Sequence, residues 1–343
     1  MRFSELFLAR INARMGLKLC TTLLFALVFN TAQAITHATD LAAQAPPTAA
    51  EWFDQGQVAS VGGLFDEALQ FFRKAAAGGS SAALVAIGDL HQRGLGTSRN
   101  EREALNWYRK AAATGNVDGQ ARLGLALVMG GSKSEMTSGL ALIQKSIAGN
   151  SAFGQYALGV LHQQGLGVSH DAVMAASLLE AAASRGEVAA QSLLGQMYLD
   201  GHGVQRHNAM AVELLSEAAR LGDANAQSRL GALFVEGWGV ERDEHEAAYW
   251  FERAVERGNL DAQARLAVLF LNGQQIRQDP LKAIDLLRQA AARGHTLAQF
   301  HLGLCLLEGR GVPQDEAQGK NMLRQLASVG MQEAKTYLKE HEL

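Results

Sequence analysis

The chain has 343 residues, of which 48% are hydrophobic, and its 31 basic and 34 acidic residues give a formal net charge of −3. A near-neutral chain without a basic run is a poor match for nucleic acid. It has two cysteines, Cys20 and Cys305, and Cys20 lies in a segment that we expect to be removed, so no intramolecular disulfide is expected.

Residues 1–34 have the pattern of a secretory signal peptide. A basic region precedes a short apolar core at 19–29, and Ala32-Gln33-Ala34 has the small-x-small form of a cleavage site. Spanning a membrane takes about 20 apolar residues, so the core is short for that role. We predict cleavage after Ala34, a periplasmic or secreted protein, and no membrane span after cleavage. An uncleaved anchor remains the alternative, because the basic region is long.

The next two segments separate this leader from the rest of the chain. Residues 35–50 contain Pro46-Pro47 and many small residues, which predicts a linker. Residues 51–80 carry two apolar stripes separated by a short turn. They predict a divergent helical hairpin that caps the N-terminal end.

From residue 81 to residue 330 the sequence repeats with a period of about 36 residues. The marker is a pair made of an aliphatic residue and a glycine, replaced by alanine in one copy: Ile87-Gly88, Leu123-Gly124, Leu158-Gly159, Leu194-Gly195, Leu230-Gly231, Leu266-Ala267 and Leu302-Gly303. A fixed period of this length is typical of stacked repeats, in which each unit buries its apolar face against its neighbours. We therefore expect seven stacked units.

The copy around Leu194-Gly195 shows the form of one unit. Apolar residues recur with helical spacing before and after Gly201-His202-Gly203, which predicts two helices joined by a tight turn. The glycine inside the first helix costs about 1 kcal/mol relative to alanine. We expect close approach of the second helix to offset that cost, through small residues such as Ala218 and Ala219.

This pattern resembles the Sel-1-like repeat family, which is related to tetratricopeptide repeats. The copy nearest the family pattern has Ile87-Gly88, Gly94-Leu95-Gly96, Ala104, Trp107-Tyr108, Lys110-Ala111-Ala112 and Gly115. Another copy has Leu230-Gly231, Phe234, Gly237-Trp238-Gly239-Val240, Asp243, Ala247, Trp250-Phe251, Ala254 and Gly258. The resemblance implies an all-α, right-handed α-solenoid of stacked helix-turn-helix repeats that binds other proteins and is not catalytic. It implies no cofactor, and we expect a monomer. Residues 331–343 are expected to form a C-terminal capping helix.

Two copies depart from the pattern. The second lacks the Gly-x-Gly-Val turn and has residues 130–134 in its place, which suggests a bend or a weak joint. The sixth loop, Gly273-Gln274-Gln275-Ile276, has lost its second glycine.

Motifs of catalysis and metal binding are missing from the chain. It has no His-Glu-x-x-His, Gly-x-Ser-x-Gly or Ser-x-x-Lys sequence. A metal site formed by the loop histidines (His170, His202, His207 and His245) is the weaker alternative to solvated side chains, because no carboxylate or thiolate completes a ligand set. We expect a protein that is not an enzyme.

Candidate partner-binding residues flank the repeated pair on the first helices of the last repeats. Arg229, Arg265 and His301 form one row, and Glu236 and Glu308 lie opposite. An apolar strip runs between the rows: Val235, Val268, Leu271, Phe300 and Leu304. One interpretation is a groove that grips a peptide. The other is that the charges form inter-repeat salt bridges and that the terminal helix covers part of the strip.

The function that these patterns favour is a periplasmic interaction scaffold. It would bind a protein or peptide of the cell envelope on the concave face, with the main site in the C-terminal half. A glycan-binding component of an exopolysaccharide or envelope complex is the alternative, with Trp238 as its best aromatic candidate. A cell-wall or β-lactam hydrolase is disfavoured, because every nucleophile and metal signature is missing.

Overall fold

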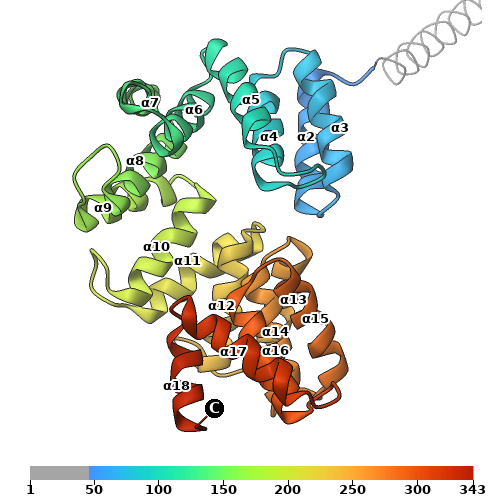
Figure 1. Cartoon of the computed structure of the whole chain (residues 1–343). Coiled ribbons are helices and arrows are strands. Elements are labelled where there is room, and N and C mark those ends of the chain that lie inside the picture. The colour runs from blue at the N-terminus through green and yellow to red at the C-terminus, as the bar shows by residue number, and fades with distance from the viewer. Residues whose placement is uncertain (1–45, 343) are drawn as a thin grey trace, which may run out of the picture. The chain divides into compact units, whose positions relative to one another are not determined.

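The computed structural model describes residues 46–342, so the predicted signal peptide, its cleavage site and most of the linker lie outside the described residues. Within that range there are seventeen helices and no strand (Figure 1). Their bounds are α2 Ala49–Val61, α3 Phe65–Ala77, α4 Ser81–Arg93, α5 Glu101–Ala113, α6 Val117–Gly130, α7 Lys133–Ala148, α8 Ala152–Gln164, α9 Ala172–Ala183, α10 Val188–Asp200, α11 Asn208–Arg220, α12 Ala224–Glu236, α13 Glu244–Glu256, α14 Leu260–Asn272, α15 Pro280–Ala292, α16 Thr296–Glu308, α17 Glu316–Ser328 and α18 Gln332–Glu340.

The helices pack in sequence order as antiparallel hairpins, each against the next (Figure 1). First helices also contact the first helix of the following hairpin, as in α6–α8, α12–α14 and α14–α16. The prediction of an all-α solenoid of stacked hairpins is confirmed. The first hairpin, α2–α3, begins at Ala49, slightly earlier than the predicted residue 51.

The repeated glycine lets a large side chain of the second helix lie against the first helix. A β-carbon added to Gly231 would lie 2.7 Å from the Phe251 ring, and one added to Gly195 would lie 2.8 Å from Leu215 Cγ. The same register brings Tyr108, Leu179 and Leu323 against Gly88, Gly159 and Gly303. The expected close approach is therefore present, but its main partner is this large residue and not the alanines proposed from sequence.

The second copy keeps its hairpin without the usual turn. Ser132 and Glu135 form a capping box at the start of α7, which replaces the glycine loop. Gly139 takes part in the close contact between α6 and α7. A β-carbon on Gly124 would lie 2.6 Å from the Gly139 carbonyl oxygen, and a β-carbon on Gly139 would lie 2.5 Å from the Gly124 carbonyl oxygen. The altered turn does not separate the two helices.

We predict that Gly231→Ala destabilises the protein by about 1–3 kcal/mol, the usual cost of overpacking a filled core. The measurement is thermal or denaturant unfolding. Gly130→Ala is the matched control, because a β-carbon there meets nothing within 4 Å; it should be neutral or stabilise by up to about 1 kcal/mol.

A second substitution separates overpacking from a general intolerance of alanine. In the sixth repeat Ala267 and Leu287 belong to the same buried cluster. Adding Phe251→Leu to Gly231→Ala imitates that pair and should recover part of the lost stability. A double variant no more stable than Gly231→Ala would contradict this explanation.

A buried carboxylate from α13 holds the sixth loop, which lacks the second glycine of the usual turn. In the preceding loop, Gly239 (φ 77°) lies so close to α11 that a β-carbon would be 2.8 Å from the Asn208 carbonyl oxygen. In the sixth loop Glu244, only 1% exposed, accepts hydrogen bonds at Oε2 from the backbone N–H groups of Gln274 and Gln275, both at 2.7 Å. Its Oε1 pairs with Arg242 at 2.7 Å. Burial would raise the pKa of Glu244, but these hydrogen bonds and Arg242 hold it below its usual value.

We predict that Glu244→Gln lowers the free energy of unfolding at pH 7 by about 1–3 kcal/mol, because the loop loses hydrogen bonds to a charged acceptor. A carboxylate with a depressed pKa stabilises the fold above its unfolded-state pKa, about 4.3, and loses that effect as the pH falls through the lower folded value. The difference in stability between the two proteins should therefore shrink below about pH 4. A difference that stayed constant from pH 7 to pH 3 would contradict the assignment.

Candidate functional site

Three cavities lie side by side along the face formed by the first helices. Their volumes are about 340, 410 and 490 Å³. The first, which we call the apolar cavity, is bounded by α12, α14 and α16. The second, the central cavity, is bounded by α10, α12 and α14. The third, the polar cavity, lies between the same three helices and extends to Tyr156 of α8. The first two share Ala232, Glu236 and Arg265, and the last two share Ser228 and Arg229. We call this continuous depression the groove.

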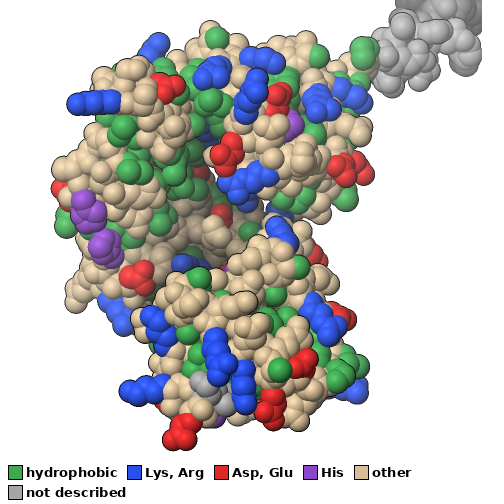
Figure 2. Space-filling model, in the orientation of Figure 1, with side chains coloured by type: hydrophobic (Ala, Val, Ile, Leu, Met, Phe, Trp, Pro, Cys, Tyr) green, Lys and Arg blue, Asp and Glu red, His purple; other side chains and the backbone are tan. Residues whose placement is uncertain are grey.

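The groove is built by the same helical positions in successive repeats. Counted from the repeated glycine, its lining residues on the first helices stand mainly at −6, −3, −2, +1, +4 and +5. These positions form one stripe, because residues three, four and seven apart lie on the same side of a helix. On α12 the stripe is Asn225, Ser228, Arg229, Ala232, Val235 and Glu236. In the space-filling view the molecule is hollowed on one side, with hydrophobic, basic and acidic side chains bordering the hollow (Figure 2).

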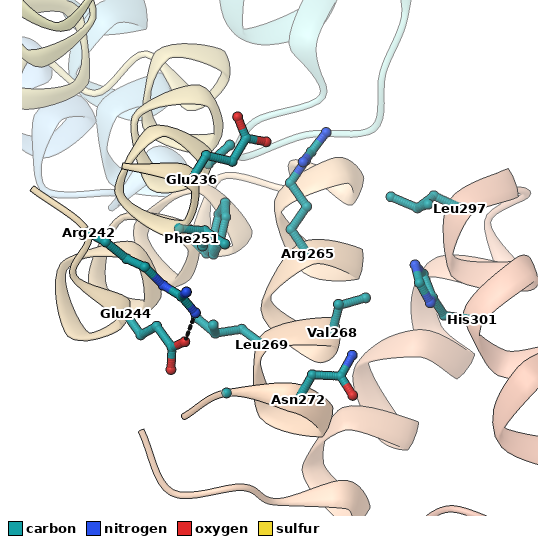
Figure 3. Close-up of a pocket in the computed structure, with 13 residues that line it drawn as sticks. Glu236, Arg242, Glu244, Phe251, Arg265, Val268, Leu269, Asn272, Leu297 and His301 are labelled. Carbon is teal, nitrogen blue, oxygen red and sulfur yellow. Dashed lines mark hydrogen bonds and ion pairs between the residues drawn. The ribbon is translucent and has the colours of Figure 1, made fainter. Parts of the chain in front are cut away.

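The cavity between α12, α14 and α16 is the apolar part of the groove. Its lining includes Val235 of α12, Val268 of α14 and Leu297 of α16. Phe251 of α13 lies between Glu236 and Leu269 in the view of Figure 3. Glu236 and Arg265 stand on either side of its mouth (Figure 3). His301 lines the α16 side, where burial lowers the pKa of its ring and so favours the neutral form.

Six of the ten predicted site residues line the groove. They are Arg229, Arg265, His301, Glu236, Val235 and Val268. The other four are elsewhere.

Leu271, at 3% exposure, and Phe300 belong to the core. Leu304 packs against the buried cluster formed by α16, α17 and Ala334 of α18. The Glu308 carboxylate lies 3.7 Å from the Arg310 guanidinium. The terminal helix contributes Tyr337, whose ring centroid is 6.5 Å from that of Phe300. Part of the predicted strip is thus covered, as the second interpretation expected.

The charged residues of the groove differ in whether they already have a partner. Asp261 pairs with Arg265 at 2.7 Å and accepts a hydrogen bond from Ser228 at 3.1 Å. Arg229 and Glu236 are exposed, and within residues 46–342 neither makes an ion pair or a side-chain hydrogen bond.

A salt bridge between neighbouring repeats occurs in the N-terminal half, and the interpretation of inter-repeat salt bridges had been made for the last repeats. Arg122, which occupies the same repeat position as Arg229, pairs with Asp89 of the preceding repeat at 2.6 and 2.8 Å. Its guanidinium also lies 3.7 Å from the centroid of the Phe153 ring. Arg122 is therefore a structural residue, whereas Arg229 is free to meet a ligand.

Sequence reasoning missed several residues of the groove. They include Gln196, Leu199, Ser228, Asp261 and Leu297. A signal was present for three of them: Ser228 lies seven residues from Val235, Asp261 four from Arg265 and Leu297 four from His301, each on the same side of its helix. No residue of α10 had been identified. Reading the full helical stripe in place of two rows would have found those three.

Other sequence candidates have structural explanations. His207 accepts a hydrogen bond from the Met210 backbone N–H and caps α11. The ring centroids of His170 and His202 lie 5.9 Å apart. No group of three or more His, Cys, Asp and Glu side chains that could hold a metal ion occurs in the described part of the chain. Cys305 is buried, which raises the pKa of its thiol to about 11.

The sequence model of the Sel1 repeat matches residues 48–80, 81–116, 152–187, 188–223, 224–259, 260–295 and 296–331. The chain belongs to the Sel1 repeat family. The first matched repeat is the α2–α3 hairpin, which we had expected to be a divergent cap, and the matched ranges leave out 117–151, the copy with the altered turn. Sel1 repeat proteins are generally protein-interaction scaffolds and typically non-catalytic.

Two solved structures show the same fold. The chain is 28% identical to c5321, described as a protective antigen of uropathogenic Escherichia coli with an SLR fold; the TM-score is 0.55, over 84% of this chain and 63% of the antigen. The chain therefore spans less than two thirds of that antigen. It is 29% identical to a Sel1 repeat protein from Oxalobacter formigenes, with a TM-score of 0.54, over 85% of this chain and 86% of that protein. No curated protein matches the chain significantly.

No helix between residues 46 and 342 is both long enough and apolar enough to cross a membrane.

Proposed function

We propose that the protein is an interaction scaffold of the cell envelope and that the groove binds an extended segment of a protein partner. The observation that carries this proposal is the continuity of three cavities across α8 to α16, with both apolar and hydrogen-bonding lining. An extended peptide needs such a combination, because its backbone amides require polar partners while its side chains require apolar ones. The membership of the Sel1 repeat family supports the same function.

The glycan alternative depends on Trp238, which is 46% exposed and lines the central cavity. The Arg206 guanidinium lies 5.4 Å from the centroid of its ring, and thus occupies a face on which a sugar would stack. This contact favours a peptide over a glycan as the occupant of the groove.

A photoreactive residue tests where the partner binds. We predict that a photo-crosslinking side chain in place of Glu236, at the mouth of the apolar cavity, gives a discrete covalent adduct with an envelope protein in cells. The same residue in place of Leu281, which is 70% exposed on the second helix α15, should give none. Adducts at Leu281 and none at Glu236 would place the partner on the other face.

The proposed location rests on the signal peptide predicted at residues 1–34. We predict that the protein recovered from a periplasmic extract begins at Ile35 by N-terminal sequencing. Recovery in the membrane fraction with residues 1–34 still attached would support the anchor instead. A deletion of residues 2–34 should leave the protein in the cytoplasm.

A further inference from the structure

The groove changes chemistry along its length. Its α14–α16 end is walled by Val268, Leu269 and Leu297. The part toward α10 adds polar side chains such as Gln196 and Ser228 among apolar ones such as Leu193. A ligand that fills both parts must therefore carry an apolar group at one point and polar groups at another. The volume of the apolar cavity, about 340 Å³, is at the small end of the range of small-molecule pockets, so it admits a bulky side chain but not a folded element.

Among the described charges of the groove, three make no ion pair or hydrogen bond: Arg206, whose guanidinium lies 5.4 Å from the centroid of the Trp238 ring, and Arg229 and Glu236. Asp223 and Asp261 accept hydrogen bonds from Ser192 and Ser228, and the Arg265 guanidinium is paired with Asp261. Arg229 remains, shared by the central and polar cavities, and Glu236 remains, shared by the central and apolar ones. The polar half of the groove thus offers an unpaired cation, and the mouth of the apolar cavity offers an unpaired anion.

These two charges define where a ligand can carry its own charge. An acidic group beside the apolar anchor would face Glu236 and be repelled, whereas an acidic group farther along would meet Arg229. Arg229 and Val235 belong to α12, and the apolar cavity extends from α12 to α14 and α16. Arg229 and Val235 are six residues apart on this helix, about 9 Å along its axis at a rise of about 1.5 Å per residue. An extended chain advances about 3.3 Å per residue, so about three residues separate the two positions.

We propose that the groove recognises an extended peptide with two determinants. One is a bulky aliphatic side chain that fills the apolar cavity; the other is an aspartate or glutamate about three residues away that pairs with Arg229. This inference rests on the proposed function and adds the chemistry of the partner to it. A basic side chain next to the aliphatic anchor is tolerated, because it would face Glu236.

Display of a library of random nine-residue peptides tests the proposal with the folded mature chain, residues 35–343, as bait. We expect the enriched peptides to share an aliphatic residue and an acidic residue about three positions apart. An individual synthetic peptide of that consensus should then bind about 10- to 100-fold more weakly to Arg229→Glu, because a charge-assisted pair is replaced by a repulsion. Arg288→Glu is the matched control: it makes the same change of charge at an exposed position on α15 and should leave binding unchanged.

A charge exchange separates direct pairing from a structural effect. The same peptide with lysine in place of its acidic residue should bind poorly to the native protein and regain affinity for Arg229→Glu. Enriched peptides with no acidic residue, or affinity that is unaffected by Arg229→Glu, would overturn this inference and leave peptide binding standing. A library from which no peptide is enriched, together with no adduct at Glu236, would count against peptide binding itself.

Discussion

The close packing of two helices within each repeat is the constraint on which the rest of the structure depends. A glycine in the first helix, such as Gly231, admits a large residue of the second helix, such as Phe251. The cost of a helical glycine, about 1 kcal/mol, is offset because a fully buried large apolar side chain contributes about 1.5–3 kcal/mol. Because the contact recurs in the same register, it fixes the rotation of each first helix, and this rotation decides which side chains face inward.

The groove follows from that fixed rotation. Once the repeated glycine faces the second helix, the positions two before and five after it lie on the shared face of the first helices. The chain has filled those positions differently in its two halves: Arg122 is bound to Asp89, whereas Arg229 has no partner among the described residues. One scaffold position therefore serves stability in one repeat and is available for recognition in another.

The departures from the repeat are compensated locally, which explains how the fold continues through them. The second copy replaces its glycine loop with the capping box of Ser132 and Glu135. The sixth loop, which has Gln275 in place of a glycine, is held by the carboxylate of Glu244 through backbone N–H groups. Each replacement supplies hydrogen bonds at the point where the usual turn is lost, so the neighbouring helices keep their packing.

The sequence by itself determined the repeat period, the hairpin in each repeat and the rows that face inward, because these depend on local helical periodicity. It placed Arg229, Arg265 and His301 in one row, and these residues do line the groove. Tertiary structure alone decided which residues stay accessible. Leu271 and Phe300 have the same apolar pattern as Val268, yet they are buried in the core. Burial depends on neighbouring repeats and on the terminal helix, and periodicity within one helix carries no information about either.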